Sequence, residues 1–126
     1  MKQIINTTHA PAAIGPYNQA NEAGGMLFIS GQIALHPVTG ALVQDDIATE
    51  THQVLQNLKA IVENAGLGLE NIVKCSVFVK NMSDYAIINS VYAEYFAAET
   101  APARELVEVA ALPRYVNIEI SAIAVR

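Results

Sequence analysis

The stretch "APARELVEV" carries two adjacent charged side chains, Arg104 and Glu105, in a mostly apolar setting. The pair could neutralise itself, it could form a solvated rim, or the arginine could bind an anion from outside the chain. Side chains alternate between the two faces of a strand, so Arg104 and Glu105 would point in opposite directions. Glu108 would share a face with Arg104, but the intervening strand separates their Cα atoms by roughly 13 Å. We therefore expect that Arg104 finds no carboxylate partner within this strand.

A further charged residue, Glu119, lies inside the apolar stretch "VNIEISAIAV". Alternation along the strand places Glu119 on one face with Asn117 and Ser121. A carboxylate in the interior of a strand is costly unless it is paired or hydrated. For this residue taken alone, two interpretations stay open: a solvated edge position, or a carboxyl group that moves protons.

The remaining candidate groups do not form a recognisable catalytic or metal-binding pattern. His9, His36 and His52 are scattered and lack the spacing of a metal site. Cys75 lies in an apolar run, where a cysteine is usually a small core residue. Ser30 lacks the G-x-S-x-G pattern of a nucleophilic serine, and the chain has no glycine-rich phosphate loop. We expect no metal site.

The composition predicts self-association. The 126 residues fit one domain, residues 1–126, with one hydrophobic core. Charged residues make up 15% of the chain, against about 25% in a typical soluble protein, and hydrophobic types make up 52%. So few charges leave apolar surface uncovered in a domain of this size. We expect a closed symmetric oligomer; the alternative is a monomer with an unusually apolar surface.

Charge and hydropathy argue against several classes of partner. The net charge is −5 and no basic run exceeds a single residue, so we do not expect a nucleic-acid binder. No run of about eighteen apolar residues is present to span a membrane, and the N-terminus does not resemble a signal peptide. A single cysteine fits a reducing compartment. We therefore expect a cytoplasmic protein without a membrane partner.

Alternation and apolar runs predict strands near residues 2–5, 17–20, 26–34, 71–80, 104–110 and 116–125. Between the second and third of these strands, "NEAGG" at residues 21–25 predicts a turn. The first three strands would therefore include a hairpin.

Apolar residues recur at helical spacing in two stretches. The first predicts a helix with Asp45 and Asp46 at its start and Gly66 just beyond its end. The second predicts a helix over residues 82–96. The resulting order, β-β-β-α-β-α-β-β, predicts an α/β fold of two helices packed on one mixed sheet. The other face of the sheet would need a partner subunit to cover it.

Several stretches together resemble the RidA (YjgF) family over nearly the whole chain, in the same order and with similar spacing. They are "APAAIGPYNQA", "FISGQIALHPVTG", "VLQNLKAIVENAGLGLENIVKCSVFVKNMSDYAIINSVYAEYF", "PARELVEVAALP" and "VNIEISAIAV". The resemblance implies a chorismate-mutase-like fold that assembles as a homotrimer, with sites in the clefts between subunits.

The resemblance also implies an activity. The deaminase branch of the family hydrolyses reactive enamines and imines, such as 2-aminoacrylate and 2-iminopropanoate, to 2-oxo acids and ammonia. A 2-iminobutanoate/2-iminopropanoate deaminase of this kind limits metabolite damage, and no metal or organic cofactor is implied. One alternative stays open, a non-catalytic binder or sensor of small 2-oxo acids that uses the same cleft. RNA cleavage, attributed to some members, is disfavoured by the acidic charge balance.

The family pattern assigns roles to individual residues of this chain. Arg104 matches the arginine that binds the substrate carboxylate, and Glu119 matches the glutamate that acts with water. Tyr17, Ser30, Gly31 and Asn89 match positions that line the cleft, and Leu106 offers its backbone N–H and C=O. Many members of the deaminase branch carry Ser-Cys directly after the motif arginine, where this chain has Glu105 and Leu106.

Overall fold

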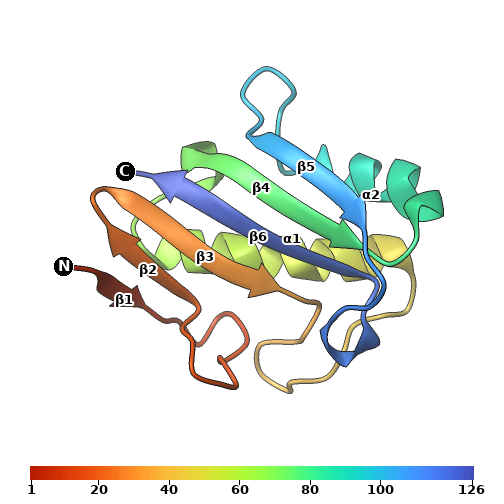
Figure 1. The fold of residues 1–126 in the computed structure, drawn as a ribbon, viewed down its shortest axis with the longest axis horizontal. Helices are drawn as coiled ribbons and strands as arrows, with labels where there is room; N and C mark the ends of the chain where they lie inside the picture. The colour runs from red at the N-terminus through yellow and green to blue at the C-terminus, as the bar shows by residue number, and fades with distance from the viewer.

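The computed structural model describes residues 1–126 and contains one six-stranded mixed sheet with both α-helices on one face (Figure 1). The strands are β1 (Gln3–Ile5), β2 (Ala20–Ala23), β3 (Met26–Gln32), β4 (Ile72–Val79), β5 (Ala103–Glu108) and β6 (Ile118–Val125), and the helices are α1 (Ile47–Asn64) and α2 (Tyr85–Tyr92). The order across the sheet is β1-β2-β3-β6-β4-β5, with β4–β5 parallel and every other pair antiparallel. The predicted element order and α/β fold are confirmed.

Helix α1 begins and ends where its sequence predicts. The Asp46 carboxylate accepts a hydrogen bond of 2.8 Å from the Thr49 N–H and so caps the helix N-terminus. Gly66 follows the last turn with a φ of 79°, and the N–H groups of Gly66 and Leu67 donate back to carbonyls of that turn. This ending needs a left-handed residue, a conformation that glycine adopts freely. Neither helix combines the length and apolarity that crossing a bilayer requires.

The hydrophobic core fills the space between the helices and the covered face of the sheet. Its fully buried members include Leu55, Leu58 and Ile61 of α1, Val77 of β4 and Ile120 of β6. Each fully buried aliphatic side chain contributes about 1.5–3 kcal/mol relative to an exposed one. This energy fixes which face of each strand is turned towards the helices, because a slip by one residue would expose the whole apolar set.

The second face of the sheet is uncovered within one chain, as expected from the absence of a third helix. It presents apolar side chains such as Phe28 and Val107, which are 40% and 43% exposed. Lys74, Ser76 and Ser121 lie on the same face. We call this surface the open face. Its apolar content agrees with the low charge content of the chain.

The hairpin formed by β2 and β3 differs from the prediction. The second strand is Ala20–Ala23 rather than residues 17–20, so Asn21 and Glu22 belong to the strand ladder and not to the turn. The turn consists of Gly24 and Gly25, with φ of 59° and 77°. Two residues of positive φ make the tight hairpin turn that matches the twist of the strands. The assignment of "NEAGG" as a five-residue turn was therefore wrong.

Helix α2 is shorter than predicted. It ends at Tyr92, whereas the apolar spacing in the sequence continues to Phe96. Beyond Tyr92 the chain forms turns, yet Phe96 remains buried and its ring centroid lies 4.6 Å from that of Tyr92. The apolar spacing beyond Tyr92 therefore reflects the burial of aromatic side chains and not a continuation of the helix.

Candidate functional site

Arg104 lies on β5 with its side chain towards the helices. Its guanidinium donates from Nη1 to Asn89 Oδ1 at 2.8 Å and from Nη2 to the Tyr85 hydroxyl at 3.2 Å. Its Cζ lies 4.8 Å from the centroid of the Tyr92 ring, within the range of a cation–π contact. All three partners belong to α2, so this helix holds the guanidinium in place. We call Arg104, Tyr85, Asn89 and Tyr92 the Arg104 site.

The guanidinium of Arg104 keeps the capacity to bind an anion. Two of its five N–H groups bond to Asn89 and Tyr85, and the other three are free. No carboxylate of the chain forms an ion pair with it, whereas Arg126 pairs with Glu22 at 2.9 Å. Arg104 is thus oriented by neutral groups, and its charge remains uncompensated within the chain.

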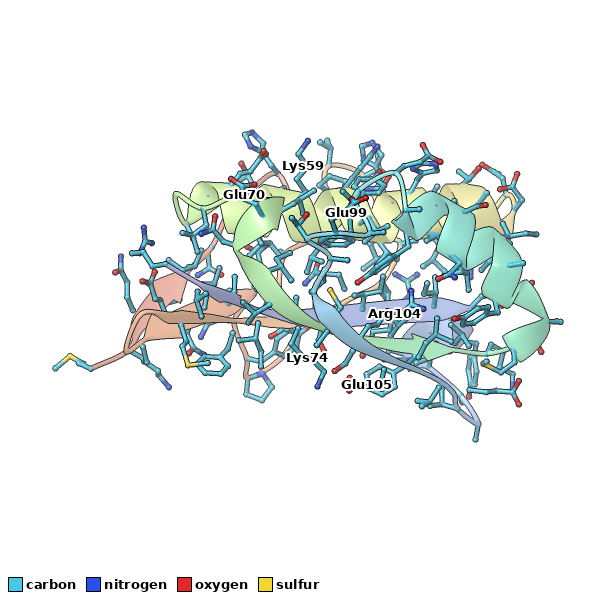
Figure 2. The ribbon with its side chains drawn as sticks, turned by 90° about the horizontal axis from the view of Figure 1, so that it is seen from above. Lys59, Glu70, Lys74, Glu99, Arg104 and Glu105 are labelled. Carbon is cyan, nitrogen blue, oxygen red and sulfur yellow. The ribbon has the colours of Figure 1, made fainter.

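Glu105 points to the open face, which confirms the prediction from strand alternation. Figure 2 shows Arg104 on the helix side of the sheet, with Glu105 and Lys74 on the other side. The Glu105 carboxylate lies 2.9 Å from the Lys74 Nζ. Hydrogen bonding from the Ser76 hydroxyl, followed by the Lys74 ammonium, holds the pKa of Glu105 below its ordinary value. Arg104 and Glu105 are therefore separate groups, although they are neighbours in the sequence.

Leu106 follows Arg104 on the helix side of β5, and its side chain packs against the core. In a parallel pair, alternate residues direct both backbone groups to the partner strand. The Val109 N–H donates to the Val79 carbonyl, so Val109 and every second residue before it direct their backbone N–H and C=O groups to β4. Leu106 belongs to the other set, whose backbone groups point to the free edge of β5. The backbone N–H and C=O of Leu106 are therefore unpaired within the chain and lie close to Arg104.

Glu119 lies on the open side of β6, opposite Phe78 of β4, and lines a pocket of about 530 Å³. The walls of this pocket include Tyr17, Ser30 and Arg114. The carboxyl is half-buried, and burial raises the pKa of Glu119 above its ordinary value. A carboxyl whose pKa is raised towards neutrality is suited to both accept and release a proton. We call this cavity the Glu119 pocket.

A bulge in β3 brings Ser30 and Gly31 against Glu119. A Cβ atom at Gly31 would lie 2.7 Å from Glu119 Cδ, so any other residue at this position would displace the carboxylate. The Ser30 hydroxyl donates to the Asn18 carbonyl at 2.6 Å and thereby tethers the segment that carries Tyr17. Gly31 thus provides the space for the carboxylate, and Ser30 fixes the neighbouring wall.

Two buried amide side chains hold loops that line the Glu119 pocket. Gln19 is 3% exposed; its Nε2 donates to the Pro11 carbonyl at 2.8 Å, and its Oε1 accepts from the Thr7 N–H at 2.7 Å. Asn57 of α1 is 1% exposed and donates to the Leu35 carbonyl at 3.0 Å. Because buried polar groups are costly unless they are hydrogen-bonded, these contacts fix both loops and preform the pocket.

A buried carboxylate holds the segment that leads into Glu119. Glu50 of α1 is fully buried, and its two oxygens accept from the backbone N–H and from the Nδ2 of Asn117, each at 2.8 Å. Asn117 directly precedes β6 and follows the turn at Pro113–Tyr115. Glu50 therefore fixes the start of β6, and with it the position of Glu119.

The structure divides the site residues expected from the sequence into two groups. Tyr17, Ser30, Gly31 and Glu119 meet at the Glu119 pocket. Arg104 and Asn89 are in contact at the Arg104 site, with Leu106 on the same strand. Within one chain the sheet separates the Arg104 guanidinium from the Glu119 carboxylate.

Several residues around these two sites were missed by reasoning from the sequence. Tyr85 and Tyr92 contact Arg104 because α2 packs beside β5, an arrangement that neither segment specifies alone. Arg114 reaches the Glu119 pocket through a left-handed turn. Glu50 and Asn57 did carry a signal, because both fall on the apolar stripe of α1 at helical spacing, where polar residues are unexpected.

Two further kinds of chemistry receive no support from the arrangement of side chains. No group of three or more histidine, cysteine, aspartate or glutamate side chains is placed to hold a metal ion. Cys75 is fully buried, and burial raises the pKa of its thiol. A buried thiol of raised pKa is a poor nucleophile, so Cys75 is a core residue, as predicted.

The chain belongs to the endoribonuclease L-PSP family, which it matches over residues 7–126. A RutC family protein from Pyrococcus horikoshii is 54% identical over 124 residues, which cover 98% of each chain. The 2-iminobutanoate/2-iminopropanoate deaminase of Escherichia coli is 52% identical over 128 residues, covering 100% of this chain and 99% of the relative. The crystal structure of E. coli TdcF with bound serine is 46% identical, with a TM-score of 0.92 and 98% of both chains covered. The resemblance to the RidA family is confirmed.

Glu50 should contribute more to stability than an exposed glutamate of the same helix. Glu50→Ala leaves two Asn117 donors without an acceptor, and a buried group left unsatisfied costs about 1–3 kcal/mol. Glu50→Gln should cost less, because its amide oxygen still accepts from the Asn117 N–H. The control Glu63→Ala, at an exposed position of α1, should change the free energy of unfolding by less than about 0.5 kcal/mol. Urea unfolding would contradict this role if Glu50→Ala lost no more than Glu63→Ala.

The raised pKa of Glu119 predicts a pH-dependent stability. The folded chain binds the Glu119 proton more tightly than the unfolded chain does, so stability falls as pH rises above the ordinary pKa of 4.5. Glu119→Gln cannot ionise and should therefore unfold at a higher temperature than the wild type at neutral pH. This advantage should vanish below about pH 4, where both states are protonated.

The matched control is Glu105→Gln, for which the expected change in stability has the opposite sign. The pKa of Glu105 is lowered, so its ionised form stabilises the fold above its ordinary pKa, and this contribution is lost as pH falls through the lowered value. Glu105→Gln should therefore unfold at a lower temperature than the wild type at neutral pH, with the difference shrinking in acid. Thermal unfolding across the pH range measures both variants, and shifts of the same sign would contradict the two environments.

Proposed function

We propose that this protein hydrolyses small imines derived from 2-amino acids, such as 2-iminopropanoate and 2-iminobutanoate, to 2-oxo acids and ammonia. The observation that carries the proposal is the Arg104 guanidinium, which is oriented by α2 and has no carboxylate partner. The 52% identity to a deaminase of these imines supports the same assignment. Serine, the molecule bound in the TdcF structure, carries the kind of α-carboxylate that Arg104 would hold here.

The reactive site is completed by assembly. In this proposal the chain forms a homotrimer in which the Arg104 site of one subunit faces the Glu119 pocket of the next. The separation of Arg104 from Glu119 by the sheet supports this arrangement, since neither group reaches the other within a chain. Burial of the apolar open face between subunits would favour their association.

Substrate binding would begin at Arg104. A guanidinium is a planar fork that holds a carboxylate by two charge-assisted hydrogen bonds, and three N–H groups of Arg104 are free for this purpose. The unpaired backbone groups of Leu106 lie close by on the same edge of β5. Anchoring the carboxylate places the C=N carbon of the imine at a fixed position relative to Glu119 of the neighbouring subunit.

Glu119 would then transfer protons during hydrolysis. The imine reacts in its protonated form: ionised Glu119 takes a proton from a water molecule as the water oxygen bonds to the imine carbon, and the C=N electron pair moves to the nitrogen to give a neutral carbinolamine. Glu119 then returns this proton to the amine nitrogen and takes the hydroxyl proton of the carbinolamine as the C–N bond breaks, so that the 2-oxo acid and ammonia form and Glu119 releases the last proton to solvent. The raised pKa of Glu119 suits a group that must gain and lose a proton within one cycle. An enamine such as 2-aminoacrylate first tautomerises to its imine.

The charge distribution favours a small molecule over RNA as the substrate, despite the name of the family. The net charge is −5, and two of the basic side chains, Lys74 and Arg126, are ion-paired. Nucleic-acid binding depends on a basic surface that neutralises several phosphates. The two unpaired arginines, Arg104 and Arg114, belong to separate sites rather than to one basic surface.

Release of ammonia from 2-aminoacrylate, generated from serine by a dehydratase, should be faster in the presence of the protein. Glu119→Gln should lower turnover by roughly 100-fold, the usual scale for general acid–base catalysis, and still bind 2-oxobutanoate. Arg104→Ala should abolish both properties, and Arg104→Lys should restore part of each.

Matched controls for these variants are Glu105→Gln and Arg126→Lys, which alter the same residue types away from both sites. Each should change turnover by less than about tenfold. Binding of 2-oxobutanoate without any acceleration of ammonia release would instead identify the protein as a non-catalytic binder of 2-oxo acids.

Mixing two inactive variants tests whether sites are shared between subunits. Arg104→Ala chains retain the Glu119 pocket, and Glu119→Gln chains retain the Arg104 site. After the two are unfolded and refolded together in equal amounts, a shared site pairs the two intact halves in about one quarter of cases, and that fraction of wild-type turnover should return. Refolding each variant alone is the control. If the mixture stays as inactive as its components, the site is built within one chain and the assembly proposal is wrong.

A further inference from the structure

The turn between β5 and β6, at Pro113–Tyr115, has an unusual backbone. Arg114 and Tyr115 have φ of 54° and 56°, and they are the only non-glycine residues of the chain with positive φ. Residues that carry a Cβ atom seldom adopt this conformation. Where they do, the surrounding structure enforces it, often at functional sites.

Neighbouring contacts hold this turn in place. The Tyr115 N–H donates to the Leu112 carbonyl at 2.8 Å. Val116, which follows the turn, is fully buried, and Asn117 is bound by the buried Glu50 carboxylate. The turn therefore presents its side chains from a fixed base.

Arg114 carries a charge at the Glu119 pocket. Among the residues that line the pocket, Arg114 is the one cation and Glu119 the one anion. The two do not form an ion pair, and burial alone accounts for the raised pKa of Glu119. The guanidinium of Arg114 therefore does not neutralise that carboxylate. Tyr115, in contrast, is 86% exposed and does not line the pocket.

The three arginines of the chain differ in what they bind. Arg126 is paired with Glu22, and Arg104 is oriented by Tyr85 and Asn89 to receive an α-carboxylate. Arg114 has no carboxylate partner, although it lies at the rim of a pocket. A guanidinium in such a position attracts an anionic group, with the planar geometry that favours a carboxylate.

We propose that Arg114 binds a second carboxylate at the far end of the substrate side chain, so that the protein accepts dicarboxylic imines and 2-oxo acids. The inference rests on the proposed function, in which Arg104 of a neighbouring subunit holds the first carboxylate. The Glu119 pocket, at about 530 Å³, falls within the size range of pockets that hold ligands much larger than 2-iminopropanoate. Arg114 offsets the repulsion that Glu119 would otherwise exert on a second negative charge.

The test compares two probes that differ in the second carboxylate, 2-oxoglutarate and 2-oxobutanoate, by calorimetric titration. Arg114→Gly removes the guanidinium, and glycine adopts a φ of 54° without strain. Tyr115→Gly is the matched control, because it removes a side chain from the same turn at a φ of 56° but outside the pocket. Arg114→Lys keeps the positive charge but loses the planar guanidinium, which can form two hydrogen bonds to one carboxylate. Thermal unfolding establishes that each variant is folded.

The measured quantity is the affinity for 2-oxoglutarate divided by that for 2-oxobutanoate. Arg114→Gly should lower this ratio by about tenfold or more, Arg114→Lys should lower it less, and Tyr115→Gly should leave it within about twofold. The role of Arg114 is overturned by an unchanged ratio in Arg114→Gly, by an equal fall in Tyr115→Gly, or by a wild-type chain that does not bind 2-oxoglutarate.

The same proteins separate this inference from the proposed function. A wild-type chain that fails to accelerate deamination of 2-iminobutanoate contradicts the proposed function, while the affinity ratio still decides the role of Arg114. If deamination proceeds and the ratio is insensitive to Arg114→Gly, the deaminase assignment stands and the second carboxylate site is wrong.

Discussion

Two helices can cover only one face of a six-stranded sheet, and the other features of this protein follow from that constraint. The covered face contains the hydrophobic core, and strand alternation then assigns every second side chain to the open face. Arg104 falls on the covered side, at the margin where α2 supplies Tyr85 and Asn89 as neutral partners. Glu119 falls on the open side, beneath loops that include one held by Asn57 of α1.

The Glu119 pocket owes its shape to polar groups in the interior rather than to the apolar core. Glu50 and Asn57 extend from α1 through the apolar layer to bind backbone groups of two different loops, and Gln19 binds a third. A buried carboxylate such as that of Glu50 is expensive to desolvate and adds little net stability compared with an apolar residue. What it provides is a defined position for the start of β6, since only one placement of Asn117 satisfies both oxygens. The loops therefore do not have to be ordered by the ligand, which lowers the entropic cost of binding.

The sequence was sufficient where a short-range rule governs the outcome. Helical spacing and a C-terminal glycine located α1, and alternation placed Arg104 and Glu105 on opposite faces. Residue preference gave the wrong bounds for β2, because Asn21 and Glu22 are residue types that seldom occur in strands. The Gly24–Gly25 turn and the pairing with β3 hold them in the strand nevertheless. Contacts between elements distant in the sequence could not be predicted, and these include the tyrosines around Arg104. The left-handed turn at Arg114 was also beyond reach, because local preference opposes it and only the surrounding contacts enforce it.

The location of Arg104 and Glu119 on the two sides of one sheet has an electrostatic consequence. A guanidinium and a carboxylate that shared one cleft would attract each other and form a resting ion pair, which an incoming anion would have to break. Glu105, beside Lys74 on the open face, shows how readily such a pair forms when the two groups share a face. Because the strands lie between Arg104 and Glu119, no rotation of these side chains can bring them into contact within one chain. Within one chain each group therefore keeps hydrogen-bonding capacity for a ligand, and in the proposed assembly the guanidinium and the carboxylate can approach each other only across a contact between subunits.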